Sequence, residues 1–160
     1  QGSTALLGAI KPLISSLSKD YQLVIQLGLA ANPDTLGLAI TADWFEAADL
    51  SWLLHHSRII ISRGGANTTA EIMATGLPAI IIPLPKASAD EQTRNATVIA
   101  STGAGLLLPQ TKLNPDTLLA AIHQIEVDYH HFKTAAKNLV KLQNPQAAAT
   151  LYQFITKKHL

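Results

Sequence analysis

The stretch RIIISRGGANTTAEIMATGLPAIIIP, residues 58–83, decides the fold of this chain. Its first apolar run, Arg58–Ser62, has the β-branched composition of a buried strand and breaks at two adjacent glycines. Residues Thr68–Ala74 have helical character and end before a glycine and a proline, after which Ala79–Pro83 repeats the buried-strand pattern. Two continuously apolar strands separated by a helix predict a parallel sheet that is covered on both faces.

The same alternation extends through the rest of the chain. It predicts one domain, residues 1–160, with an α/β fold built on a doubly wound parallel sheet of the Rossmann-like type. Further strands are expected at Tyr21–Leu27, Leu38–Thr41 and Gly105–Leu108. One further helix is expected to follow the polar loop Pro85–Ala89 and to end at about Ser101. The other helices are expected at Ala5–Leu17, Ala47–His56, Asp116–Ile125, Tyr129–Leu142 and Pro145–Lys158.

The composition excludes several classes of function. Lys and Arg number 12 against 11 Asp and Glu, so the net charge of +1 gives no field of the strength that a nucleic-acid partner requires. The chain has no cysteine, which removes disulfides, thiol nucleophiles and cysteine-based zinc sites. Its longest apolar runs fall far below the ~20 residues of a membrane-spanning helix. A cytoplasmic protein is therefore expected.

The turn after the first quoted strand is the best candidate for a binding site, because ligands of open parallel sheets bind beyond the carboxyl ends of the strands. Gly64 and Gly65 let the backbone approach a ligand closely, and the unpaired amides of Asn67–Thr69 favour an anion such as a pyrophosphate. Glu71, one turn later, suits the hydroxyls of a ribose. Thr68 and Glu71 also fit a capping box, which needs no ligand, so the spacing leaves both interpretations open.

Other polar and aromatic residues favour less specific roles. The pairs His55–His56 and His130–His131 are adjacent in sequence and project in different directions from a helix, so a surface role is expected and no metal site. Asp90 and Glu91 are too close in sequence to flank a glycosidic bond from opposite sides. Trp44 and Trp52 are expected in the core or at an interface. Arg63 suits either a phosphate or a neighbouring carboxylate.

The segment ISRGGANTTAEIMATGLPAIIIPLP followed by DEQTRNA resembles the donor-binding domain of MurG-type glycosyltransferases of the GT-B fold, family 28. Gln1-Gly2-Ser3 resembles the end of a Gly-rich loop of that family, and Gly103-Ala104-Gly105 follows its pattern further on. The resemblance covers nearly the whole chain. It implies that the chain is the C-terminal half of a GT-B enzyme and that the first strand of the sheet precedes Gln1. It also implies an N-terminal acceptor-binding domain, either in cis or as a separate chain.

The resemblance also implies an activity: transfer of N-acetylglucosamine from UDP-GlcNAc to a lipid-linked peptidoglycan precursor, at the inner face of the cell membrane. The anomeric centre is inverted, and the reaction uses no metal and no cofactor besides the donor. The proposed catalytic base belongs to the N-terminal half, so no catalytic residue is assigned here. By the resemblance, the diphosphate of the donor contacts Ala66, Asn67 and Thr68, and the ribose contacts Glu71. The sugar hydroxyls contact Glu91 and Gln92, and the uracil lies against Phe45–Ala47. Ser3, Ala47, Arg63, Gly64 and Gly65 complete the expected substrate-binding set.

The chain departs from the family pattern at two points. Many members have His or Gln where Glu91 stands, which leaves the identity of the sugar open, and the loop Lys86–Ala89 is one residue longer than in some relatives. The alternatives are a GT-B transferase with another sugar or lipid acceptor, such as the separate donor subunit of the eukaryotic dolichol-linked enzyme, and a UDP-sugar-binding module without transfer activity.

Overall fold

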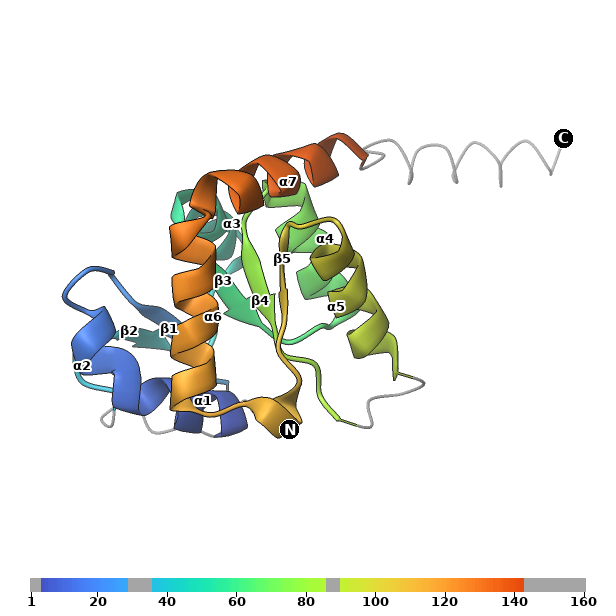
Figure 1. Cartoon of the computed structure of the whole chain (residues 1–160). Helices are drawn as coiled ribbons and strands as arrows, with labels where there is room; N and C mark the ends of the chain where they lie inside the picture. Colours follow the sequence, from blue (N-terminus) through green and yellow to red (C-terminus); the bar gives the residue numbers. More distant parts are fainter. Residues whose placement is uncertain (1–3, 29–35, 86–89, 143–160) are drawn as a thin grey trace, which may run out of the picture.

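The computed structural model describes residues 4–28, 36–85 and 90–142, and its strands form two parallel pieces of sheet (Figure 1). In the first piece, β1 (Val24–Gln26) pairs with β2 (Ile40–Ala42). In the second, the order is β3 (Ile60–Ser62), β4 (Ala79–Ile81) and β5 (Gly105–Leu107), with β4 in the centre. Because the strands within each piece are parallel, the carboxyl ends of each piece share one edge.

Helices connect the strands and cover both faces. The prediction of a doubly wound parallel α/β fold is confirmed. The helical elements are α1 (Thr4–Ile10), η1 (Lys11–Leu13), α2 (Ile14–Leu17), α3 (Ala47–His56), α4 (Ala66–Thr75), α5 (Glu91–Ser101), η4 (Gln110–Lys112), α6 (Pro115–Val127) and α7 (Tyr129–Leu142).

Strand β4 and the residue after it show why the sequence takes this fold. Ile80 and Ile82 pack into a core with α1, η1, α2 and α6, whereas Ala79 and Ile81 pack into a second core with α4, α5 and α7. None of these four side chains is exposed to solvent. An unbroken apolar run is what a strand buried on both faces requires, since successive side chains point to opposite sides.

The observed elements differ from the predicted ones mainly at their ends. Helices α3 and α7 have the predicted bounds. The single helix expected over Ala5–Leu17 is divided by the 3₁₀ turn η1, which contains Pro12. A proline has no amide N–H and its ring crowds the preceding turn, so a regular α-helix does not continue through it. The helix predicted at Pro145–Lys158 lies outside the described residues.

Side chains of α6 and α7 form bonds at the amino edge of the sheet. Helix α7 lies across this edge, at the top of Figure 1, where α4 ends. The Lys133 ammonium donates to the carbonyl oxygen of Gly76, the left-handed residue that terminates α4, at 2.9 Å. Arg58 donates to both carboxylate oxygens of Glu126 and lies over the ring of Tyr129. These contacts tie α6 and α7 to the residues that precede β3 and follow α4.

Candidate functional site

The site begins where β3 ends and α4 begins. Arg63, Gly64 and Gly65 connect the two elements, and α4 starts at Ala66 with Gly65 as its N-cap residue. The first bond inside the helix runs from the Thr69 amide to the Gly65 carbonyl oxygen, at 2.9 Å. The prediction of an unpaired amide at Thr69 is therefore wrong, and the amides without an acceptor within the helix are those of Ala66, Asn67 and Thr68. Helix α4 has no side-chain cap and no acidic residue in its first turn, so these amides are available to an anion.

The two glycines of the turn serve different purposes. A Cβ atom on Gly64 would lie 2.4 Å from the backbone oxygen of Gln92, so Gly64 is needed for the close approach of α5. A Cβ atom on Gly65 would meet nothing within 4 Å. The interpretation that both glycines clear space for a ligand is therefore incomplete: packing inside the protein accounts for Gly64, and only Gly65 faces open space.

Glu71 lies one turn into α4 and its side chain is exposed. The alternative in which Thr68 and Glu71 close a capping box is wrong, because the N-cap position belongs to Gly65 and Thr68 is the third residue of the helix. The carboxylate of Glu71 is therefore not required to cap the helix start. It lies on the helix whose uncapped amides face the same edge of the sheet.

Arg63 is bound to the protein itself. Its Nη1 donates to the carbonyl oxygen of Ile82 at 3.1 Å, which ties the end of β3 to the end of β4. Burial lowers the pKa of the Arg63 guanidinium below its ordinary value, although an arginine stays charged at neutral pH. The sequence suggested a phosphate or a neighbouring carboxylate as the partner of Arg63, whereas the observed partner in this bond is a backbone carbonyl.

Helix α5 brings the second group of predicted residues to the same edge. Asp90, in the left-handed conformation at φ 55°, precedes Glu91, the exposed first residue of the helix. Gln92 is half-buried, and its Oε1 accepts a hydrogen bond from the Leu84 amide at 3.0 Å. The side-chain NH₂ of Gln92 is then the part of its amide that remains to donate to a ligand.

The remaining predicted residues lie at the start of α3 and at the beginning of the chain. Ala47 is the exposed first residue of α3, which follows the carboxyl end of β2 after Phe45 and Glu46. Ala47 and the α4 turn thus share the edge formed by the strand ends. Ser3 lies outside the described residues, as does the loop Lys86–Ala89.

Asn95 is a residue of this site that the sequence reasoning missed. Its Nδ2 donates to the carbonyl oxygen of Gly64 at 2.9 Å. Asn95 follows Glu91 by four residues and Gln92 by three, so all of them lie along one side of α5. That spacing was a usable signal, whereas the partner of Asn95, 31 residues earlier, was not visible in the sequence.

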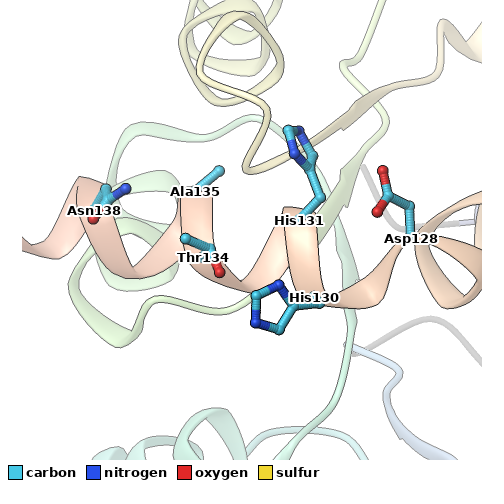
Figure 2. A pocket seen from close by; sticks show the side chains of 6 residues that line it. All are labelled: Asp128, His130, His131, Thr134, Ala135 and Asn138. Carbon is cyan, nitrogen blue, oxygen red and sulfur yellow. The ribbon is translucent and has the colours of Figure 1, made fainter.

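The histidines and tryptophans lie elsewhere on the surface. Figure 2 shows His130 and His131 projecting to different sides of α7, around an open hollow that is also lined by Asp128 and Asn138, at the amino edge of the fold. His55 and His56 are exposed on α3. Within the described residues, no His, Cys, Asp or Glu side chains gather in a group of three or more that could hold a metal ion.

Trp44 and Trp52 do not belong to the core. Their exposed fractions are 70% and 60%, so the core interpretation is wrong. Trp52 stacks on His56 within α3, and Trp44 follows the carboxyl end of β2. In the described part of the chain, no helix is long and apolar enough to cross a membrane.

Several curated proteins with similar sequences carry the name UDP-N-acetylglucosamine--N-acetylmuramyl-(pentapeptide) pyrophosphoryl-undecaprenol N-acetylglucosamine transferase. The protein of Leuconostoc citreum is 31% identical over 97% of this chain and 45% of its own length. That of Alkalilimnicola ehrlichii is 37% identical over 74% of this chain and 33% of its own length. The chain therefore spans less than half the length of these relatives.

Solved structures show the same fold. MurG of Acinetobacter baumannii superposes with a TM-score of 0.78 at 24% identity, over 98% of this chain and 47% of that one. The spinosyn forosaminyltransferase SpnP superposes with a TM-score of 0.70 at 19% identity, over 87% of this chain and 34% of that one. The model of the glycosyltransferase family 28 C-terminal domain matches residues 1–151. A chain with these strands, this turn and this match belongs to the glycosyltransferase family 28 C-terminal domain family.

Proposed function

We propose that this chain is the donor-binding half of a glycosyltransferase that transfers N-acetylglucosamine from UDP-GlcNAc to a lipid-linked peptidoglycan precursor. The observation that carries the proposal is the uncapped start of α4, with the exposed carboxylate of Glu71 one turn later. Amides that lack an internal acceptor suit a diphosphate, and a carboxylate accepts hydrogen bonds from both hydroxyls of a ribose. The shared name of the curated relatives supports the choice of sugar and acceptor.

The sugar is assigned to the first turn of α5. Glu91 is exposed there and offers a carboxylate that accepts from hydroxyl groups, while the NH₂ of Gln92 donates to them. Backbone groups along Phe45–Ala47, at the start of α3, complete the site on the side of the uracil. A donor with its diphosphate at Ala66–Thr68 thus has complementary groups at the ribose, the base and the sugar.

We further propose that the acceptor and the catalytic base are provided by an N-terminal half, in cis or as a separate chain. The chain covers 45% of the length of its Leuconostoc citreum relative, which supports a missing half. The division of the sheet into β1–β2 and β3–β4–β5 supports a further parallel strand between β1 and β3. In this proposal the complete enzyme inverts the anomeric centre, needs no metal, and works at the inner face of the membrane as a peripheral protein, while the chain alone transfers little or no sugar.

A thermal-shift titration tests the donor assignment. A ligand that binds only the folded state raises its stability with the logarithm of ligand concentration above the Kd. UDP and UDP-GlcNAc are expected to raise the Tm in this way, UDP-glucose less than UDP-GlcNAc, and uridine, which lacks the diphosphate, very little. No shift with millimolar UDP or UDP-GlcNAc would overturn the proposal.

The second candidate is a family relative that uses another sugar or acceptor. It is favoured by the carboxylate of Glu91, the position at which the sequence departs from the pattern of the family that it resembles. A larger shift with another UDP-sugar would select this candidate. Nucleotide binding without any transfer, after an acceptor-binding half has been supplied, would instead identify a non-catalytic UDP-sugar-binding module.

A further inference from the structure

The first turn of α5 is bonded to the turn that precedes α4. Asn95, half-buried on α5, donates from Nδ2 to the Gly64 carbonyl oxygen at 2.9 Å. The Gln92 backbone oxygen approaches Gly64 so closely that a Cβ atom there would lie at 2.4 Å from it. A backbone contact and a side-chain bond therefore fix Gly64 against the same helix, one residue before the N-cap of α4.

The same helix turn is also bonded to the segment that follows β4. The Leu84 amide donates to Oε1 of Gln92 at 3.0 Å, and Arg63 donates to the Ile82 carbonyl oxygen at 3.1 Å. The strand ends of β3 and β4 are thus joined to each other and to α5. A change in the position of α5 moves the Gly64 peptide, and the direction of this peptide sets the direction of the α4 amides.

We propose that Asn95 is a positioning residue that couples the diphosphate subsite at Ala66–Thr68 to the sugar subsite at Glu91 and Gln92. This inference rests on the proposed function. By holding the Gly64 carbonyl, the Asn95 side chain keeps the helix that binds the sugar in register with the helix that binds the diphosphate. Its contact is with the protein, so its effect on the donor is transmitted through Gly64.

A residue that only stabilised the fold would weaken all ligands alike, whereas a coupling residue weakens most the ligand that occupies both subsites. Of the diphosphate and sugar subsites, UDP occupies only the first, and UDP-GlcNAc occupies both. The ratio of their dissociation constants therefore separates the two roles, because a smaller folded fraction changes both constants by one factor and leaves the ratio unchanged.

The experiment compares Asn95→Ala and Asn95→Asp with wild-type protein by calorimetric titration of UDP and of UDP-GlcNAc. Asparagine and aspartate have the same shape, but an ionised carboxylate cannot donate to the Gly64 carbonyl. Both variants are expected to weaken UDP-GlcNAc about fivefold relative to UDP, the effect of one hydrogen bond of ordinary net strength. Thr97→Ala is the matched control, since the Thr97 hydroxyl bonds to Thr93 within the same helix and is exposed.

The outcomes separate this inference from the function on which it rests. Wild-type protein that binds neither ligand overturns the proposed function. Wild-type protein that binds both, with an unchanged ratio in the Asn95 variants, overturns the coupling role alone. Should Asn95→Ala fail to fold, as judged by circular dichroism, the isosteric Asn95→Asp decides the question by the same ratio.

Discussion

Two of the helices that begin at the carboxyl edge of this sheet, α4 and α6, treat their first amides in opposite ways. At the start of α6, the Asn114 side chain accepts from the Thr117 amide at 2.9 Å and the Thr117 hydroxyl accepts from the Asn114 amide at 3.0 Å, which closes a capping box. At the start of α4, the N-cap residue is Gly65, which has no side chain to offer. One helix start is satisfied internally and the other is left for a ligand.

Helices α3 and α5 also lack a side-chain cap, so the open start of α4 indicates a binding site only together with the free space at Gly65 and the exposed Glu71. A glycine N-cap gives up only roughly a few tenths of a kcal/mol relative to a side-chain cap, and it leaves the first amides open to an acceptor from outside the helix. The family to which the chain belongs supplies the use that we propose, which is binding of a nucleotide diphosphate.

The largest effect is expected when the open helix start is closed. Gly65 has φ −63° and free space where a Cβ would point, so Gly65→Asp fits without strain and provides a cap. The new carboxylate competes for the α4 amides and repels a diphosphate, so UDP binding is expected to fall about 100-fold or more. Unfolding in urea should show a free energy within about 0.5 kcal/mol of wild type. If this variant kept its affinity for UDP, the diphosphate could not be bound at the start of α4.

A smaller effect is expected at the ribose. Glu71→Gln removes a charge that accepts hydrogen bonds, each worth roughly 1.5–3 kcal/mol, so UDP is expected to bind about 10- to 100-fold more weakly. Because the Glu71 side chain is exposed and does not cap the helix, the Tm of the variant without ligand should stay within about 1 °C of the wild-type Tm. Calorimetry and thermal unfolding together check the two parts, and a loss of stability without a loss of affinity would show Glu71 to be structural.

The smallest effect on the ligand is expected at the capped helix. Asn114→Ala removes the capping box of α6, which should cost about 1 kcal/mol of unfolding free energy and lower the Tm by about 2–4 °C. UDP affinity is expected to remain within twofold of wild type, as measured by calorimetry well below the Tm. A large loss of affinity in this variant would mean that the contrast between the two helix starts does not mark the site.

The sequence was informative where burial dictates the residues and less so where distant contacts do. The apolar run Ala79–Pro83 predicted a buried strand because few other environments tolerate such side chains in succession, and none of the side chains from Ala79 to Ile82 is exposed. Thr68 and Glu71 were misleading as a possible cap, since the position of the first helical residue depends on the turn at Gly65. The capping box at Asn114 was missed because its second member is Thr117 in place of the usual Glu or Gln.

Two kinds of feature could not be predicted from the sequence: bonds to distant backbone carbonyls and the exposure of two large aromatic side chains. Asn95 and Arg63 bond to backbone carbonyls 31 and 19 residues away, and a carbonyl carries no mark in the sequence. Trp44 and Trp52 were expected in the core or at an interface because of their size, yet they are exposed at one end of β2 and on α3.

The central claim is that the unpaired amides at the start of α4 bind a diphosphate, and amide NMR of the protein tests it most directly. Titration with UDP is expected to shift the resonances of the Ala66, Asn67 and Thr68 amides, while uridine leaves them unchanged. The Thr117 amide, already bonded to Asn114, serves as the internal reference and should not move with either ligand. Saturable UDP binding that shifts other amides and leaves those of Ala66–Thr68 in place would contradict the account.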